Sequence, residues 1–196
     1  MCPGPRGMMA PRLHADEMLA GLCRWLRAAG LDCTQAAPGT DDARVLEAAR
    51  ADDRLLLTRD RALAGQARRS GARVLLVEGD TLEAQARELA MRLGIDWLYR
   101  PMSRCLRCNV PIRPAPCSLR KSLPFALRED EPLWYCPSCG RPYWAGSHVR
   151  RMMRRLRDWA GVAGRNGLED MGTPDQGAGV SAQKGTHNAE DEPDNG

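Results

Sequence analysis

Four cysteines in the second half of the chain form two pairs with identical spacing, and they limit its fold more than any other feature. The pairs are Cys105 with Cys108 and Cys136 with Cys139, and 27 residues separate them. Zinc binds four thiolates in a tetrahedron, and each Cys-x-x-Cys turn supplies two of them from one knuckle. The separation is longer than in most ribbons, so we expect strands and a long loop between the knuckles. Two disulfides or free thiols are the alternative, and the spacing favours zinc.

The compartment that we expect is the cytoplasm. The N-terminal segment lacks the continuous apolar run of a secretory signal, and no apolar run approaches the length of a membrane span. Cysteines stay reduced in the cytoplasm, which favours metal binding over disulfides.

Strand-like and helix-like patterns alternate before the first knuckle. Alternation of this kind predicts a parallel sheet with helices on both faces. The first helix should bury Met18, Leu22 and Trp25 on one stripe. The expected strands lie near 12–15, 32–36, 55–58 and 73–77, and the expected helices span about 18–29, 41–52, 60–70 and 82–93.

The chain after residue 98 is different in character. Several prolines predict an irregular loop between the knuckles, and short strands are expected at 133–136 and 141–144. An amphipathic helix should run from about Ser147 to Ala160. We therefore divide the chain into a disordered lead (1–11), an α/β domain (12–98), a zinc ribbon with a basic helix (99–160) and a disordered acidic tail (161–196).

Charge is concentrated in the ribbon. Residues 99–160 carry 13 basic and 4 acidic side chains, whereas residues 12–98 carry 13 basic and 14 acidic ones. A cationic surface of this kind attracts polyanions, nucleic acid first. The alternative is a basic face that only serves solubility. The tail is acidic, and we take it as a hypothesis that it folds back on the ribbon and competes with nucleic acid.

Aspartates follow each of the expected strands. They are Asp16, the pair Asp41 and Asp42, Asp60, and Asp80. Parallel strands end at one edge of a sheet, where ligand sites usually form, so these carboxylates should converge. Converging carboxylates suit Mg²⁺ or Mn²⁺, and two such ions can activate water against a phosphodiester.

A second interpretation of the same aspartates is local. Each one stands at an expected helix start, where Asp is a preferred N-cap. Asp80 with Glu83 even has the spacing of a capping box. The metal site depends on the acids acting together.

These residues also resemble a known family. Residues 13–19, 24–27 and 56–61 resemble the PIN-like RNase family named after the C-terminal region of the worm Mut-seven protein. Residues 103–109 and 136–148 look like the zinc ribbon that follows this domain in the family. The resemblance covers roughly Arg12 to Trp159. His14 is a departure, because an apolar residue is usual there.

The resemblance implies a three-layer PIN-like α/β domain, followed by a small zinc ribbon and a C-terminal helix. It also implies a divalent-metal-dependent ribonuclease that cleaves RNA phosphodiesters, with Mg²⁺ or Mn²⁺ held by Asp16, Asp42 and Asp60. Asp80 would be a fourth acid, and Asp41 replaces Asp42 if the register slips by one. Zinc would be structural. The side chains that we expect to bind RNA are Arg104, Arg107, Arg141, His148, Arg150, Arg151 and Arg154.

Two other functions remain open. The first is a non-catalytic RNA-binding protein that uses the PIN-like fold and the ribbon as a scaffold, because a fold does not guarantee activity. The second is the toxin of a toxin–antitoxin pair, which the added ribbon disfavours. A membrane partner is not expected.

Overall fold

The structure is a computed structural model that describes residues 10–123, 127–128 and 130–165. The expected disordered lead lies almost wholly outside this range, and so does the acidic tail beyond residue 165. No helix in the described part of the chain has the length and apolarity that a membrane span requires.

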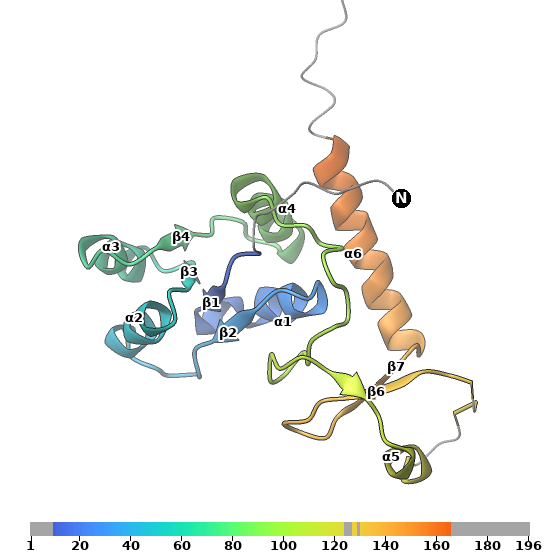
Figure 1. The fold of residues 1–196 in the computed structure, drawn as a ribbon. Helices are drawn as coiled ribbons and strands as arrows, with labels where there is room; N and C mark the ends of the chain where they lie inside the picture. The colour runs from blue at the N-terminus through green and yellow to red at the C-terminus, as the bar shows by residue number, and fades with distance from the viewer. Residues whose placement is uncertain (1–9, 124–126, 129, 166–196) are drawn as a thin grey trace, which may run out of the picture.

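A four-stranded parallel sheet forms the centre of the N-terminal part (Figure 1). The strands are β1 (Leu13–Ala15), β2 (Cys33–Gln35), β3 (Leu55–Thr58) and β4 (Val74–Leu76), in the order β2-β1-β3-β4. The chain moves from β1 outward to β2 and then crosses back to β3. The direction of winding therefore changes between β1 and β3, and such a point is where open α/β sheets bind ligands.

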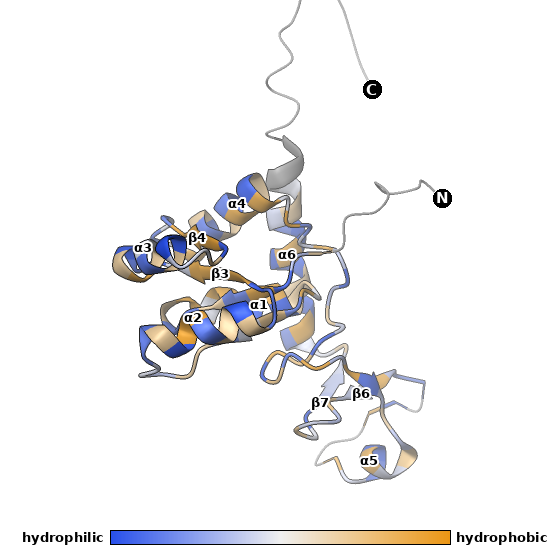
Figure 2. Ribbon diagram, turned by 60° about the vertical axis from the view of Figure 1, so that its left-hand side comes forward, coloured by the Kyte–Doolittle hydropathy of each residue, from blue (hydrophilic) through white to orange (hydrophobic). Residues whose placement is uncertain are grey.

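Helices cover both faces of the sheet, so the expected three-layer α/β fold is confirmed. One face carries α2 (Asp42–Ala51) and α3 (Arg61–Arg69), and the other carries α1 (Ala20–Ala28) and α4 (Leu82–Leu93). Successive residues of β3 alternate between the two cores, because strand side chains point to opposite faces. Leu56 packs with α2 and α3, while Leu55 and Leu57 pack with α1 and α4. Figure 2 shows β3 as an apolar strand between these layers.

The stripe expected for the first helix is wrong at its N-terminal end. Met18 is 60% exposed, although Leu22 and Leu26 are buried. A 3₁₀ turn, η1 (Glu17–Leu19), precedes α1. It has three residues per turn, so the 3.6-residue period of α1 does not extend back to Met18.

The ribbon contains more regular structure than expected. Its three strands, β5 (Arg113–Pro114), β6 (Leu133–Tyr135) and β7 (Pro142–Trp144), pair antiparallel in that order. A short helix, α5 (Cys117–Lys121), follows β5. The expectation of an irregular loop here was wrong for β5 and α5. Pro114 is tolerated because β5 is an edge strand, which does not need every backbone donor.

The last helix, α6 (Ser147–Arg165), begins where expected but continues past Ala160. Its buried residues belong to the core shared by α1 and α4, and not to a core of the ribbon; they are Met152, Leu156 and Trp159. Trp159 contacts Trp25 and Trp97 edge to face, with ring centroids 5.0 and 4.9 Å apart. Each such pair contributes about 0.5–1.5 kcal/mol beyond its burial. The ribbon is therefore an insertion between α4 and α6 (Figure 1).

Candidate functional site

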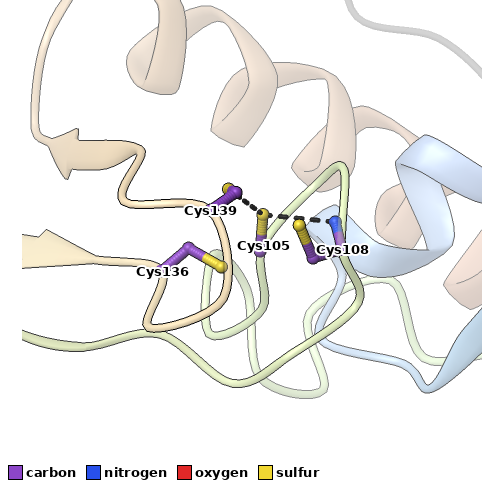
Figure 3. Close-up of side chains that lie close together, drawn as sticks. All are labelled: Cys105, Cys108, Cys136 and Cys139. Carbon is purple, nitrogen blue, oxygen red and sulfur yellow. Dashed lines mark hydrogen bonds between the residues drawn. The ribbon is translucent and has the colours of Figure 1, made fainter.

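The four cysteines of the two knuckles face one another (Figure 3). Their sulfur atoms all lie within 4.8 Å of one another, and none is in a disulfide. Cys105 Sγ and Cys139 Sγ are 3.8 Å apart. A tetrahedron with Zn–S bonds of about 2.3 Å also places its sulfurs about 3.8 Å apart. The donor set and its spacing therefore fit one zinc ion.

Each knuckle closes with the same backbone geometry. Asn109 N–H donates to Cys105 O at 3.0 Å, and Gly140 N–H donates to Cys136 O at 2.9 Å. The residue after each Cys-x-x-Cys pair has a positive φ, 64° at Asn109 and 70° at Gly140. Glycine and asparagine are the residues that adopt this conformation most readily, which explains why they follow the cysteines.

Tyr143 supports the first knuckle. Its hydroxyl donates to Cys105 Sγ at 3.2 Å and accepts from Leu106 N–H at 3.0 Å. Burial on its own raises the pKa of Cys105, but the Tyr143 hydroxyl and backbone N–H groups lower the pKa to about 6. A hydrogen bond to Cys139 raises the pKa of Cys108 to about 12. Of these two cysteines, Cys105 therefore loses its proton more readily, and the thiolate is the form that zinc binds.

Arg27 joins the ribbon to the α/β domain. Its side chain is buried, and Nε donates to Cys33 O at 2.7 Å. Nη1 donates to Leu106 O at 3.1 Å and to Arg107 O at 2.7 Å, both in the first knuckle. One cation thus fixes β2 and the knuckle together.

Asn109 makes a second connection across the same boundary. Its Nδ2 donates to Asp32 Oδ1 at 2.6 Å, and its Oδ1 accepts from Cys33 N–H at 3.2 Å. Burial opposes ionisation of Asp32, but hydrogen bonds from Arg54 and Asn109 outweigh it and lower the pKa of the carboxyl group. Sequence reasoning missed this network because its members lie far apart along the chain.

Two of the expected catalytic acids follow the neighbouring strands β1 and β3, at the point where the winding changes. Asp16 follows β1 and is only 8% exposed. Its Oδ2 accepts from the Thr58 hydroxyl at 2.8 Å, and Thr58 Oγ1 accepts from Asp60 N–H at 2.9 Å. Thr58, which is fully buried, therefore links Asp16 to Asp60 across the neighbouring ends of β1 and β3.

Asp16, Asp60 and Asp41 also act as N-caps, as the local interpretation expected. Asp16 Oδ1 accepts from Glu17 N–H at 2.6 Å, and Asp60 Oδ1 accepts from the backbone of α3 at 2.6 and 3.1 Å. Asp41 caps α2 by accepting from Arg44 N–H at 3.0 Å. Capping and a link between strands are therefore both present at this edge.

Asp42 and Asp80 stand apart from the linked pair. Asp42 Oδ2 accepts from Gln66 Nε2 at 3.2 Å. The Asp80 side chain is 89% exposed and forms an ion pair with Arg59. The capping box expected at Asp80 was wrong, because Thr81 caps α4 instead. In the described part of the chain, the four cysteines are the only group of three or more potential metal ligands, so the expected acids do not gather into a cluster of three.

Most of the basic residues expected to bind RNA are exposed. Arg107, Arg141, His148, Arg150, Arg151 and Arg154 all belong to this exposed set. Arg104 differs, because Nε donates to Gly30 O at 3.3 Å and Nη1 donates to Asn109 O at 2.7 Å. It holds the ribbon against α1. Arg24 on α1 was not expected at this surface, and its Nη2 lies 3.1 Å from His148 Nε2.

Comparison with protein families agrees with this arrangement. The model of the Mut7-C RNAse domain matches residues 11–156, which include the sheet, the ribbon and most of α6. No curated protein and no solved structure matches the chain. Since the match spans far more than half of the sequence, the chain belongs to the Mut7-C RNAse domain family.

Proposed function

We propose that this protein is a divalent-metal-dependent ribonuclease that hydrolyses RNA phosphodiesters. The observation that supports this most is the link from Asp16 through Thr58 to Asp60 at the point where the winding of the sheet changes. The family match supports RNA chemistry at this fold. Together they favour the carboxyl edge of β1 and β3 as the active site.

A pair of carboxylates is enough for Mg²⁺ or Mn²⁺. Magnesium usually keeps several waters and takes one or two protein carboxylates plus substrate phosphate oxygens, rather than a closed protein cage. Each carboxylate oxygen has two lone pairs, so the caps and the Thr58 hydroxyl leave Asp16 and Asp60 able to act as ligands. We assign the ion to these two residues, with Asp42 and then Asp80 as more distant acids.

The chain's own contribution is orientation and charge. When bound, the ion would lower the pKa of a water molecule and offset the charge of the phosphate. Thr58 and the Glu17 N–H fix the rotamer of Asp16, and the first turn of α3 fixes Asp60. Because both acids are held by buried or backbone groups, they would not need to reorganise when RNA binds.

The ribbon has a structural and a binding role in this proposal. Zinc on the four cysteines holds the two knuckles together, and the exposed basic residues face RNA phosphates. Arg104 is outside the contacting set, because its guanidinium is bonded to main-chain carbonyl groups. A cytoplasmic location would keep the zinc thiols reduced.

Asp-to-Asn substitutions test the catalytic assignment. Asp60→Asn keeps the single oxygen that accepts from the backbone of α3, whereas Asp16→Asn can keep only one of the two hydrogen bonds that Oδ1 and Oδ2 accept. Both variants should fold and retain zinc, with Asp16→Asn the less stable of the two. We expect both to lose RNA cleavage in the presence of Mn²⁺. Asp41→Asn is the matched control, since Asp41 is an exposed helix cap, and it should cleave normally. Cleavage that survives both Asp16→Asn and Asp60→Asn would eliminate this site.

The second candidate is a non-catalytic RNA-binding protein. Its supporting observation is that Asp41 and Asp60 both cap helices, which gives them a purely structural role. Titration with Mn²⁺ separates the candidates. An ion at 100 times its Kd should stabilise the nuclease by about 2.7 kcal/mol, whereas the scaffold should show no increase in melting temperature.

A further inference from the structure

A groove of about 750 Å³ lies along the boundary between the α/β domain and the ribbon. One wall is a face of α1 with the end of β2, and the other is the first knuckle, β7 and the first turn of α6. Both walls are held in place by Arg27, which bonds to β2 and to the knuckle. Arg27 therefore fixes the position of the first knuckle relative to β2, and these two segments lie on opposite walls of the groove.

The groove is lined by cations. Arg24, Arg107, Arg141 and His148 line it and are exposed, and none of its described lining residues is Asp or Glu. The lining comes from segments far apart in the chain, since Arg24 lies on α1 and His148 on α6. The N-terminal turn of α6 also borders it, and the unpaired N–H groups of a helix start add positive potential. A polyanion is the ligand that this lining favours.

An aromatic side chain completes the lining. Trp144, at the end of β7, borders the groove and is partly exposed. A methyl group at Gly146 would approach Trp144 Nε1 to 2.7 Å, so glycine at that position leaves room for the indole. Aromatic rings beside cationic side chains form the combination that binds single-stranded nucleic acid, because bases stack while arginines meet phosphates.

Part of the groove lining lies beside the acidic edge. Gln35 lines the groove and is the register partner of Ala15 in β1. Ala15 is directly followed by Asp16. RNA bound beside Gln35 would therefore lie close to the carboxylate proposed to bind the metal, and Asp16 itself is not among the residues that line the groove.

We propose that this groove binds single-stranded RNA and guides it from the ribbon to Asp16 and Asp60. Its volume lies within the range of about 300–1,000 Å³ that encloses small ligands, so it has room for unpaired nucleotides. The guidance to the acids rests on the proposed nuclease function, but binding in the groove does not depend on it.

Binding assays on the zinc-loaded full chain test the groove without relying on catalysis. The probe is a fluorescein-labelled 12-nucleotide unstructured RNA, measured by anisotropy without Mg²⁺ or Mn²⁺. The groove variant is Arg24→Ala with Arg141→Ala. The control is Arg68→Ala with Arg69→Ala, which removes the same charge from the exposed end of α3.

We expect the groove variant to bind at least tenfold more weakly and the control to bind within twofold of the wild type. The slope of log K against log salt should fall by about 1.4 in the groove variant, for two lost phosphate contacts on a single strand. The same RNA annealed to its complement should bind weakly to all proteins. An RNA with abasic positions should bind less tightly than the intact strand, because it cannot stack.

An equal loss of RNA affinity in the groove variant and in the control would refute RNA binding in the groove. Equal affinity for the duplex would overturn its preference for single strands, and equal affinity for the abasic strand would overturn stacking on Trp144. The outcomes are separable from the nuclease proposal. Cleavage by Asp16→Asn would refute the catalytic site and leave the groove intact, whereas normal RNA binding by the groove variant would refute the groove alone.

Discussion

Removing the Thr58 hydroxyl should uncouple the two aspartates of the candidate active site. Thr58 is fully buried, donates to Asp16 Oδ2 and accepts from Asp60 N–H. Thr58→Val keeps the shape of the side chain but removes both hydrogen bonds. The Asp16 carboxylate, which is only 8% exposed, and the partly buried Asp60 N–H then lose these partners.

The magnitude follows from these two contacts. A hydrogen bond to a charged group contributes about 1.5–3 kcal/mol, and a buried donor without a partner costs about 1–3 kcal/mol. The extra buried methyl group returns roughly 0.8 kcal/mol. We expect Thr58→Val to lower the free energy of unfolding by about 2–4 kcal/mol. Thr58→Ser keeps the hydroxyl and loses one methyl group, which should cost only about 0.5–1.5 kcal/mol.

The rate of RNA cleavage should depend on whether residue 58 carries a hydroxyl group, and not on the overall stability of the variant. A misplacement of about 1 Å at a reacting centre can cost about 100-fold in rate. Thr58→Val should therefore lose most of its Mn²⁺-dependent RNA cleavage, while Thr58→Ser stays close to the wild type. Urea unfolding gives the stability, and cleavage of a labelled RNA below the unfolding temperature gives the rate.

The reasoning fails if Thr58→Val is as stable as the wild type, or if Thr58→Ser is the more damaged variant. Either result would show that the link between Asp16 and Asp60 contributes little. Unchanged cleavage in a destabilised Thr58→Val would leave the link structural and remove it from the catalytic argument.

Three further predictions concern the scaffold. Gly30→Ala should lower the free energy of unfolding by more than about 2 kcal/mol, because φ is 90° and the new methyl group would lie 2.2 Å from Arg100 O. Gly21→Ala is the control, because Gly21 has open space around it in a helix. It should raise the free energy of unfolding by about 0.5–1 kcal/mol in the same urea titration. Burial lowers the pKa of His14, so the stabilisation that comes from its neutral form is complete above pH about 6.5 and is lost as the pH falls through the lowered pKa. The free energy of unfolding of His14→Leu should therefore rise relative to that of the wild type as the pH falls from about 8 to about 5. A difference in free energy that stays constant over this pH range would refute the prediction. Arg27→Met should lower the free energy of unfolding by about 3–5 kcal/mol and speed proteolysis of the ribbon, because three main-chain carbonyl groups lose the buried cation that donates to them. A digestion pattern identical to that of the wild type would contradict this prediction.

Local patterns predicted the N-terminal part of the fold well. The run Leu55–Thr58 is β3 in the structure with the same bounds, because a short apolar run between turn residues has few alternatives to a buried strand. Met18 was placed wrongly because a 3₁₀ turn shifted the phase of the stripe. The spacing of apolar residues in α6 predicted which side of the helix is buried, but not the elements on which that side packs. Leu156 and Trp159 pack on α1 and α4, and the sequence of α6 itself does not indicate this.

The candidate site was predictable in part. The position of Asp16 and Asp60 at neighbouring strand ends follows from the alternation of strands and helices. Their connection through Thr58 does not, because it depends on the register of β1 against β3. The choice between Asp80 and Thr81 as the cap of α4 is a shift of one residue, which propensities alone do not decide. The Arg27 and Asn109 contacts join residues more than 70 positions apart, and a single sequence carries no signal for them.

The return of α6 to the first core has a consequence for synthesis on the ribosome. Trp97 is made well before its partner Trp159, which lies 62 positions later in the chain, and synthesis of those residues takes about 3–12 s at 5–20 residues per second. During that interval the apolar side of α1 and α4 on which α6 later packs is exposed to solvent in the nascent chain. The four cysteines of the ribbon are synthesised within the same interval. The apolar side of α1 and α4 is therefore open to aggregation until α6 has been made and has packed on it.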